Sequence, residues 1–318
     1  MIQINNILRC FPNGIVRKID EYFTINNIGL NYLEEIRIRV NRPIILKLGK
    51  EEIIIEYIVK TEEILEILGQ LCDNSIYSYQ NQICNGYITL KGGHRVGISG
   101  NVVIKDGKII NISYISSLNF RIAKQVLGAS DKIIKYILNK NENTIYTTLI
   151  ASPPGVGKTT IVRDLVRRIS NGIENINFKG INVGVVDERG EIAAMYRGVP
   201  QNDIGQRTDV LDGVSKSIGM TMLIRSMSPK VIVADEIGKR EDVDAIRYGV
   251  CSGIKGIFTA HASSIEDIKL NPALKDLIDN FTFERIIFLS DKKEKCGIEK
   301  VYALNKEERH YYQLKLEE

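Results

Sequence analysis

Residues 151–160 of the chain read Ala151-Ser152-Pro153-Pro154-Gly155-Val156-Gly157-Lys158-Thr159-Thr160. An apolar, β-rich run over 144–150 precedes this segment, and the apolar periodicity after it predicts a helix that ends at Gly172. A strand, a glycine-containing loop and a helix, with Lys-Thr at the loop exit, are the layout of a nucleotide phosphate loop. The alternative is an ordinary Gly/Pro turn before a helix, which the flanking pattern disfavours.

The residue types of this loop suit an anion. Backbone N–H groups at a helix N-terminus attract negative charge, and Gly155 and Gly157 let that backbone approach a phosphate closely. Pro153 and Pro154 have no N–H, so the hydrogen-bond donors are expected from residues 155–160. The predicted nucleotide-binding residues are Ser152, Pro153, Pro154, Gly155, Val156, Gly157, Lys158, Thr159 and Thr160.

Two side chains at the loop exit carry specific expectations. We expect Lys158 to reach the β- and γ-phosphates of ATP and the Thr159 hydroxyl to ligate Mg²⁺. Ser152 stands where the usual motif has its first glycine, and this position shapes the turn more than it touches phosphate. The predicted cofactors are therefore ATP and Mg²⁺.

A second element is the apolar run 231–234, which ends in Asp235-Glu236 roughly 75 residues after the loop. This pattern fits a central strand that delivers two carboxylates to a Mg²⁺–phosphate centre. We expect Asp235 to hold the metal through water and Glu236 to polarise the attacking water. The alternative is a buried strand that ends in two surface acids.

Two further strand ends carry polar residues. A strand over 180–186 leads into Asp187-Glu188-Arg189, and acids at the carboxyl end of a parallel strand lie beside the phosphate site. A strand over 256–260 leads into His261, which at that position can sense a γ-phosphate or serve as a structural side chain. Between these strands, 199–213 is predicted to be a long loop and 214–227 a helix.

The 318 residues suggest two domains, 1–125 and 126–318, in a globular protein with 44% hydrophobic residues. A net charge of +4 is too small to indicate nucleic acid or an anionic membrane. Five scattered cysteines are typical of reduced thiols, and three histidines without a Cys/His cluster argue against structural zinc. No signal peptide or 18-residue apolar run is visible, so we expect a soluble, intracellular protein that meets membranes only through partners.

The first domain is predicted to be an α+β module without a nucleotide motif. Within it, His94 and Arg95 lie at a Gly-Gly turn, where they could face a ligand or a neighbouring subunit; a solvated turn is the favoured reading. Its predicted elements are strands 34–40, 44–48 and 52–57, helices 61–72 and 76–84, and two hairpins over 85–100 and 102–112.

The remaining elements of the second domain follow the same reasoning. We predict helices over 130–138, 242–250 and 265–278, the last interrupted by Pro272. Strands over 283–289 and 300–304 should pair across the charged turn 291–295, and 311–316 is a candidate last strand.

Several unusual motifs occur in one order along nearly the full chain, and together they resemble the stage III sporulation protein AA family. They are Glu35-Ile36-Arg37-Ile38-Arg39, Gly86-Tyr87-Ile88-Thr89, Gly92-Gly93-His94-Arg95-Val96-Gly97, the 152–160 loop, Asp187-Glu188-Arg189, Arg207-Thr208-Asp209-Val210-Leu211-Asp212, Arg225-Ser226-Met227-Ser228-Pro229 and Asp235-Glu236-Ile237-Gly238. The family is similar in turn to hexameric ATPases of type II and type IV secretion systems.

This resemblance implies an α/β fold with a RecA-like P-loop ATPase core and a smaller, mobile N-terminal α+β domain. It implies a cytoplasmic motor in the mother cell of an endospore-forming bacterium, forming a hexameric ring at a channel to the forespore. Asp235 and Glu236 correspond to the Walker B pair, Glu188 to the acidic box and His261 to the histidine box. Lys158 and Thr159 correspond to the phosphate and Mg²⁺ ligands.

The hypothesis is therefore Mg²⁺-dependent hydrolysis of ATP to ADP and phosphate, coupled to domain motion in a ring. Such a ring needs a cation at the transition state, for which Arg95, Arg121, Arg207 and Arg225 are candidates. A nucleic-acid-dependent RecA-like ATPase is an alternative, although no Lys/Arg stripe interleaved with aromatic residues is visible. A nucleotide-binding scaffold without turnover is another, and a small-molecule kinase is the least favoured.

Overall fold

The computed structural model describes residues 7–290 and 297–316, and the chain divides into two compact units. The first unit comprises 1–124 together with 194–201, and the second comprises 125–193 and 202–318. The division predicted from the sequence places 194–201 with the second domain. In the structure this segment packs within the first unit, where the N–H of Gly92 donates to Oε1 of Gln201 (2.8 Å) and Arg197 pairs with Asp73.

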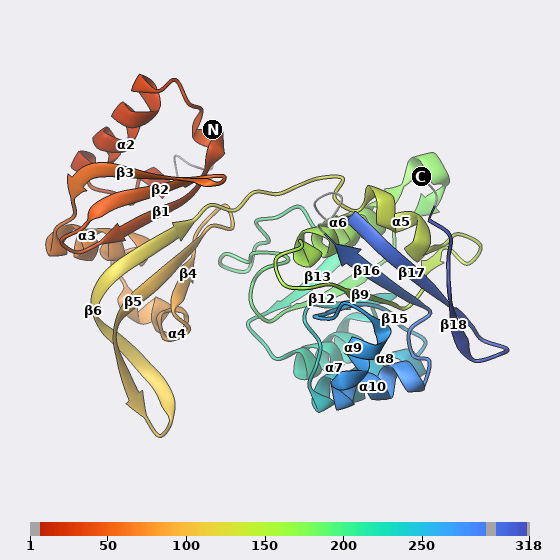
Figure 1. Ribbon diagram of the computed structural model, residues 1–318. Helices are drawn as coiled ribbons and strands as arrows, with labels where there is room; N and C mark the ends of the chain where they lie inside the picture. Colours follow the sequence, from red (N-terminus) through yellow and green to blue (C-terminus); the bar gives the residue numbers. More distant parts are fainter. Residues whose placement is uncertain (1–6, 291–296, 317–318) are drawn as a thin grey trace. The chain divides into compact units, whose positions relative to one another are not determined.

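The first unit is built on a six-stranded antiparallel sheet with the order β3-β2-β1-β6-β5-β4 (Figure 1). Alternation along β1 and β2 buries Ile36, Ile38, Ile44 and Leu46 on one face, as the period of two predicts. The strands are β1 (Leu33–Arg39), β2 (Pro43–Leu48), β3 (Glu51–Ile58), β4 (Tyr87–Thr89), β5 (Arg95–Lys105) and β6 (Lys108–Arg121).

Helices complete the core of this unit. They are α2 (Asn13–Ile25), α3 (Thr61–Leu71) and α4 (Gln80–Cys84), with short 3₁₀ turns η1 (Leu30–Tyr32) and η2 (Ile76–Tyr79). The predicted helix over 76–84 is thus a 3₁₀ turn followed by a short α-helix. The predicted hairpin over 102–112 is confirmed around Asp106-Gly107, and it forms the tip of one long hairpin of β5 and β6 that extends beyond the predicted bounds. A β-bulge at Gly100, where a side chain would meet the carbonyl oxygen of Ser113, replaces the expected break.

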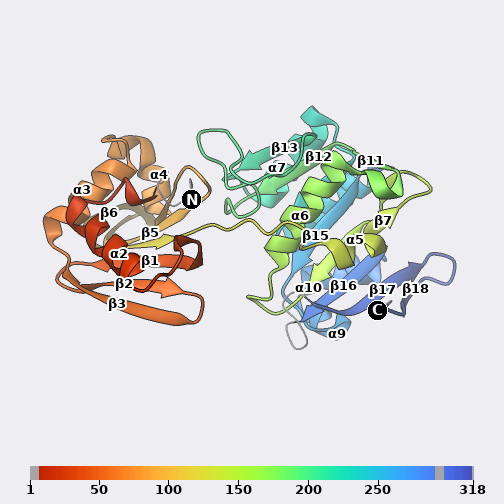
Figure 2. The same ribbon diagram turned by 90° about the horizontal axis from the view of Figure 1, so that it is seen from above.

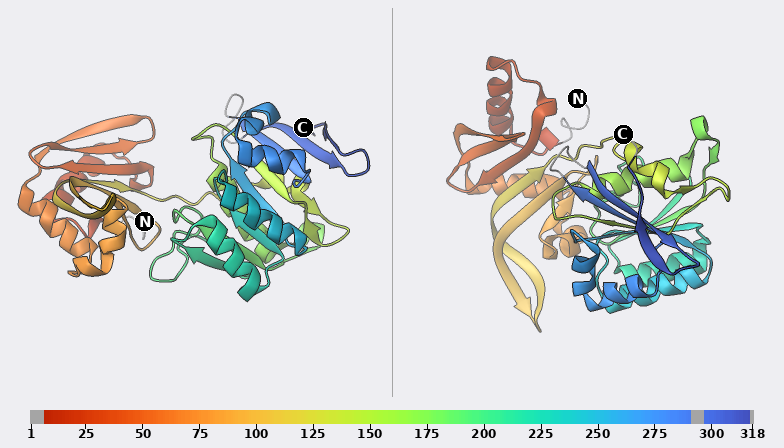
Figure 3. Two further views of the ribbon diagram at one scale, coloured as in Figure 1. Left: turned by 90° about the horizontal axis from the view of Figure 1, so that it is seen from below. Right: turned by 45° about the vertical axis from the view of Figure 1, so that its right-hand side comes forward.

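The second unit is built on an eight-stranded sheet with the order β13-β12-β14-β15-β9-β16-β17-β18. The strands from β13 to β16 pair in parallel, whereas β17 and β18 add an antiparallel extension (blue in Figure 3). The strands are β9 (Thr148–Ala151), β12 (Val183–Asp187), β13 (Thr208–Asp212), β14 (Val231–Ala234), β15 (Lys255–Ala260), β16 (Arg285–Ser290), β17 (Gly297–Asn305) and β18 (His310–Gln313).

Helices cover both faces of this sheet, which explains why its inner strands are apolar throughout. Helices α5 (Asp131–Ile137) and α6 (Lys158–Asn171) lie on one face (Figure 2), and the other helices lie on the opposite face (Figure 1). Those are α7 (Lys216–Met227), α8 (Arg240–Cys251), α9 (Ile265–Leu270) and α10 (Pro272–Asp279). Short pairs β7 (Leu138–Asn139) with β8 (Thr144–Ile145) and β10 (Gly172–Ile173) with β11 (Phe178–Lys179) complete the unit, with η3 (Glu174–Ile176).

One prediction for this unit needs correction. The segment 199–213 is not all loop, because 208–212 forms the edge strand β13, where polar side chains are tolerated. The predicted interruption at Pro272 is confirmed: α9 ends at Leu270, and Pro272 starts α10, which the side chain of Asn271 caps by accepting from the N–H groups of Ala273 and Leu274. The predicted turn 291–295 lies outside the described residues.

Within the described ranges, none of the helices combines the length and the apolar character needed to cross a bilayer.

Candidate functional site

The loop between β9 and α6 has the conformation that its glycines permit. Gly155 and Gly157 have φ values of 81° and 108°, in the left-handed region where a side chain would be strained. Lys158 begins α6, and its Nζ donates to the carbonyl oxygens of Ser152 (2.9 Å) and Pro153 (3.2 Å). Ser152, the departure from the usual motif, is fully buried and its hydroxyl also accepts from Lys158 (3.0 Å). The serine thus stabilises the loop entry instead of disrupting it.

The topology brings distant strand ends to one edge of the sheet. The strands β12, β14, β15 and β9 are consecutive and parallel, so the residues that follow them share the carboxyl edge. The sequence-predicted site residues that follow these strands are Lys158, Thr159, Glu188, Asp235, Glu236 and His261.

Asp235 joins the loop to the second acidic element. Its Oδ2 accepts a 2.7 Å hydrogen bond from the Thr159 hydroxyl, and its Oδ1 accepts from the hydroxyl of Thr259. The Thr259 hydroxyl also accepts from the N–H of Glu236 (2.7 Å). Sequence reasoning missed Thr259, although a fully buried threonine next to the end of an apolar strand is the signal that could have found it.

Glu236 lies in a chain of charged contacts. Its Oε1 is 3.1 Å from Nε2 of His261, and its Oε2 is 2.6 Å from Nη1 of Arg189. Nδ1 of His261 in turn lies 3.1 Å from Nζ of Lys158. Glu236 itself has a φ of 54°, in the left-handed region that is uncommon outside glycine. Imidazole therefore links the lysine of the loop to the second carboxylate.

The electrostatics of Lys158 reflect its surroundings. Burial lowers the pKa of its ammonium group, and the negative charges of Asp235 and Glu236 act in the opposite direction. The two carboxylates therefore favour the charged form of a lysine that is only 6% exposed.

The two acids at the carboxyl end of β12 have different roles. Asp187 is buried, and its carboxylate accepts from the N–H groups of residues 191–193, so it organises the loop that follows. Glu188 instead forms an ion pair with Lys216, the first residue of α7. Sequence reasoning missed Lys216, because a single lysine at a helix start has the pattern of a surface residue.

The candidate cations differ in position. Arg207 donates to the carbonyl oxygen of Ser170 (3.0 Å), near the end of α6 opposite to Lys158. Arg225 lies in the last turn of α7 over the ring of Tyr248, whereas Lys216 at the first turn reaches the site. Neither arginine joins the cluster around Glu236 of its own chain.

Two candidates belong to the first unit. His94 is 1% exposed, and its Nδ1 accepts from the N–H of Ala123 (3.1 Å), so the favoured reading of a solvated turn is wrong for this residue. Arg95 stacks on the ring of Tyr87 at 4.4 Å, and its partner across the hairpin is Arg121. A Cβ at Gly92 would lie 2.8 Å from Nε2 of His94, so the glycine at this turn leaves room for the buried imidazole.

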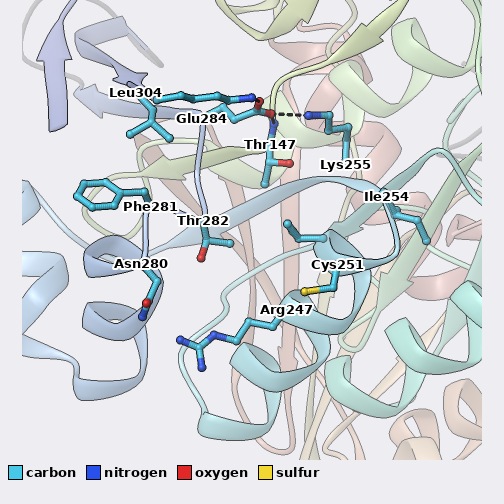
Figure 4. A pocket seen from close by; sticks show the side chains of 13 residues that line it. Thr147, Arg247, Cys251, Ile254, Lys255, Asn280, Phe281, Thr282, Glu284 and Leu304 are labelled. Atoms are coloured by element: carbon cyan, nitrogen blue, oxygen red, sulfur yellow. Dashed lines mark hydrogen bonds and ion pairs between the residues drawn. The ribbon is translucent and has the colours of Figure 1, made fainter. Parts of the chain in front are cut away.

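A cavity of about 390 Å³ lies at the opposite, amino edge of the same sheet (Figure 4). Thr147, Lys255 and Glu284 line it beside apolar residues such as Ile254 and Leu304. Glu284 accepts from Nζ of Lys255 at 2.7 Å. This ion pair is therefore well separated from the cluster at the carboxyl edge.

Comparison with known proteins identifies the family. Residues 2–309 match the family described as sporulation stage III, protein AA, so the chain belongs to that family. The stage III sporulation protein AA of Bacillus subtilis (strain 168) is 40% identical over 270 residues, which cover 85% of this chain and 86% of the relative. The uncharacterized protein Ycf45 of Porphyra purpurea is 29% identical over 209 residues, or 65% of this chain and 33% of that protein.

Solved structures show the fold. The X-ray structure of the Legionella pneumophila ATPase DotB matches with a TM-score of 0.58 and 13% identity, covering 91% of this chain and 82% of that chain. The pilus retraction motor PilT with bound ADP matches with a TM-score of 0.53 and 12% identity, covering 93% and 83%. The predicted fold class, a RecA-like α/β core with an additional N-terminal domain, is confirmed.

Proposed function

We propose that this member of the sporulation stage III protein AA family hydrolyses ATP to ADP and phosphate in a Mg²⁺-dependent reaction. The hydrogen bond from Thr159 to Asp235 carries the proposal, because it joins the loop at the N-terminus of α6 to the acidic end of β14. A loop with two glycines in the left-handed region, followed by a buried lysine, suits the phosphates of a nucleotide.

The residues present also fit Mg²⁺. The Thr159 hydroxyl and the Asp235 carboxylate are hard oxygen ligands, and Mg²⁺ in nucleotide sites takes one or two such ligands in addition to phosphate oxygens and water. These two side chains would hold the ion, and Thr259 would keep Asp235 oriented toward it. When bound, Mg²⁺ neutralises the negative charge that develops on the phosphate oxygens.

Glu236 is the proposed general base. It would accept a proton from the water that attacks the γ-phosphorus, because it follows Asp235 directly and lies in the same cluster as Lys158. His261 would hold the orientation of Glu236 and respond to the position of Lys158, which contacts the γ-phosphate in this proposal. Glu188, which pairs with Lys216, is the third carboxylate of the proposed site, beside Asp235 and Glu236.

The cellular setting follows from the family and remains a proposal. This ATPase would power a channel between mother cell and forespore. It would lie on the mother-cell side of the membrane and act through membrane partners. A hexameric ring would let Arg207 or Arg225, which lie away from the Glu236 cluster of their own chain, act on a neighbour's nucleotide. Binding and release of the γ-phosphate would drive motion between the two units.

The test compares Lys158→Ala and Glu236→Gln with the parent in phosphate release and ATP binding. We expect Lys158→Ala to lose ATP affinity, whereas Glu236→Gln should keep the affinity and lose about 10²-fold or more in turnover. Sedimentation with and without ATP tests the ring. Parental turnover in Glu236→Gln would contradict the assignment of the base, and ATP binding without phosphate release in any assembled state would indicate a scaffold.

A further inference from the structure

Lys216 is a cation in an unfavourable position. It is the first residue of α7, where the helix dipole disfavours positive charge, and its side chain is only 10% exposed. Burying an ammonium group is costly unless a carboxylate compensates for it. Its partner Glu188, which follows β12, supplies that carboxylate.

The Glu188–Lys216 pair lines a small cavity at the carboxyl edge of the sheet. The cavity measures about 20 Å³, and roughly 10–15 Å³ is enough for one water molecule. Beside Glu188 and Lys216, its charged walls are Asp187, Arg189, Glu191, Asp235 and Glu236. The ion pair therefore shares a space of water size with both acids of the second acidic element.

Two other charged groups that line this cavity are held by different contacts. The carboxylate of Asp187 accepts from the N–H groups of the following loop, and Arg189 pairs with Glu236 from a largely exposed position. Of the two glutamates after β12 that line the cavity, Glu188 and Glu191, Glu188 is the one that pairs with Lys216, and it can offer an oxygen to the cavity. Like charges on Asp235 and Glu236 would push it away, and the ammonium group of Lys216 counteracts that repulsion.

We propose that Lys216 is a positioning residue that holds Glu188 against the attacking water, so that Glu188 and Glu236 together orient it. The inference rests on the proposed ATP hydrolysis. In that step the water oxygen forms a bond to the γ-phosphorus, and the bond to the bridging oxygen breaks with its electron pair remaining on ADP. One water proton passes to Glu236 and then to solvent, while Glu188 and Lys216 exchange no proton.

The experiment uses the neutral pair Glu188→Gln/Lys216→Met in the full chain. Removing both charges avoids the unpaired buried charge that could unfold either single variant. We expect the Kd for ATP and the KM to stay at the parental values, whereas kcat falls about tenfold or more, because water orientation acts on the chemical step. Lys216→Arg, which retains the charge, should recover most of kcat.

The matched control is Lys255→Met/Glu284→Gln at the amino edge of the same sheet (Figure 4). This lysine–glutamate pair has comparable burial, although Glu284 also pairs with Lys306 and accepts from the N–H of Thr147. Because it lies away from the carboxyl edge, its removal should leave kcat unchanged. Thermal unfolding of both double variants is measured in parallel.

Three results would overturn the inference. Parental kcat in Glu188→Gln/Lys216→Met means that the pair does not orient water. An equal loss of kcat in the control pair means that Lys216 is a structural residue. Phosphate release by the parent that does not exceed that of Lys158→Ala means that the proposed function itself is wrong, and the inference fails with it.

Discussion

The hydroxyl of Thr159, at the start of α6, lies 2.7 Å from Oδ2 of Asp235, at the end of β14. On the other side of the same carboxylate, Oδ1 accepts from the hydroxyl of Thr259 in β15. Asp235 is thereby fixed between two hydroxyls that come from neighbouring parts of the sheet edge. Because Mg²⁺ demands close-to-ideal octahedral geometry, a fixed carboxylate is an advantage for binding it.

Thr259→Val should therefore weaken Mg²⁺ binding more than nucleotide binding. Valine keeps the volume of threonine but removes the hydroxyl that orients Asp235 and accepts from the N–H of Glu236. We expect the Mg²⁺ concentration for half-maximal phosphate release to rise about tenfold, as for other residues that orient a metal ligand. Thr148, buried at the start of β9, supplies the control Thr148→Val. An unchanged Mg²⁺ requirement would contradict the orienting role.

His261 should matter for turnover and not for ATP affinity. Its imidazole lies between Nζ of Lys158 and Oε1 of Glu236, both at 3.1 Å, so it connects the proposed phosphate ligand with the proposed base. We expect His261→Ala to lower kcat about tenfold or more while the Kd for ATP changes little. His310, exposed in β18, provides the control His310→Ala. Loss of ATP affinity with unchanged kcat would assign His261 to binding instead.

Asp164 should give the stability of the second unit a defined pH dependence. Burial alone would raise its pKa, but hydrogen bonds from Ser130 and Arg167 outweigh burial and hold the pKa below its ordinary value of 3.8. A carboxyl group whose pKa is lower in the folded than in the unfolded state stabilises the fold at pH values above its unfolded-state pKa. This contribution is lost as the pH falls through the folded-state pKa. Asp164→Asn should cost about 1–3 kcal/mol at pH 7, measured by urea unfolding.

The difference between Asp164→Asn and the parent should then shrink as the pH falls below 3.8, because the unfolded chain binds a proton there that folded Asp164 still excludes. A difference that is constant from pH 7 to pH 3 would mean that shape, not charge, sets the contribution of Asp164.

The cysteines should react in the order of their exposure and thiolate content. Burial, with a smaller effect of Asp73, raises the pKa of Cys10 and of Cys72 to about 11, whereas Cys251 is exposed on α8. Because only the thiolate is nucleophilic, iodoacetamide at pH 8 should modify Cys251 well before Cys10 and Cys72. Peptide mass spectrometry follows the rates, with unfolded protein as the control. Equal rates in the folded protein would contradict the packing of the first unit.

Local patterns in the sequence were sufficient for much of this protein. The loop 151–160 and the apolar run before Asp235 predicted two strands, a helix and a site, because phosphate binding restricts residue types and spacing. Apolar strands bounded by helices likewise predicted the parallel sheet. Family motifs in one order predicted the RecA-like fold, which the comparisons confirm.

Other features depend on contacts between residues that are far apart along the chain. No local periodicity in the sequence reveals these features. They are the ion pair between Lys216 and Glu188, the hydrogen bond from Thr259 to Asp235 and the burial of His94. The same holds for 194–201, which packs with the first unit although the chain around it belongs to the second. The sequence by itself thus determined which groups could bind a nucleotide, since that chemistry requires particular residue types. Only the tertiary structure decided which groups orient them, because any polar residue that the strand order brings within hydrogen-bond distance can do so.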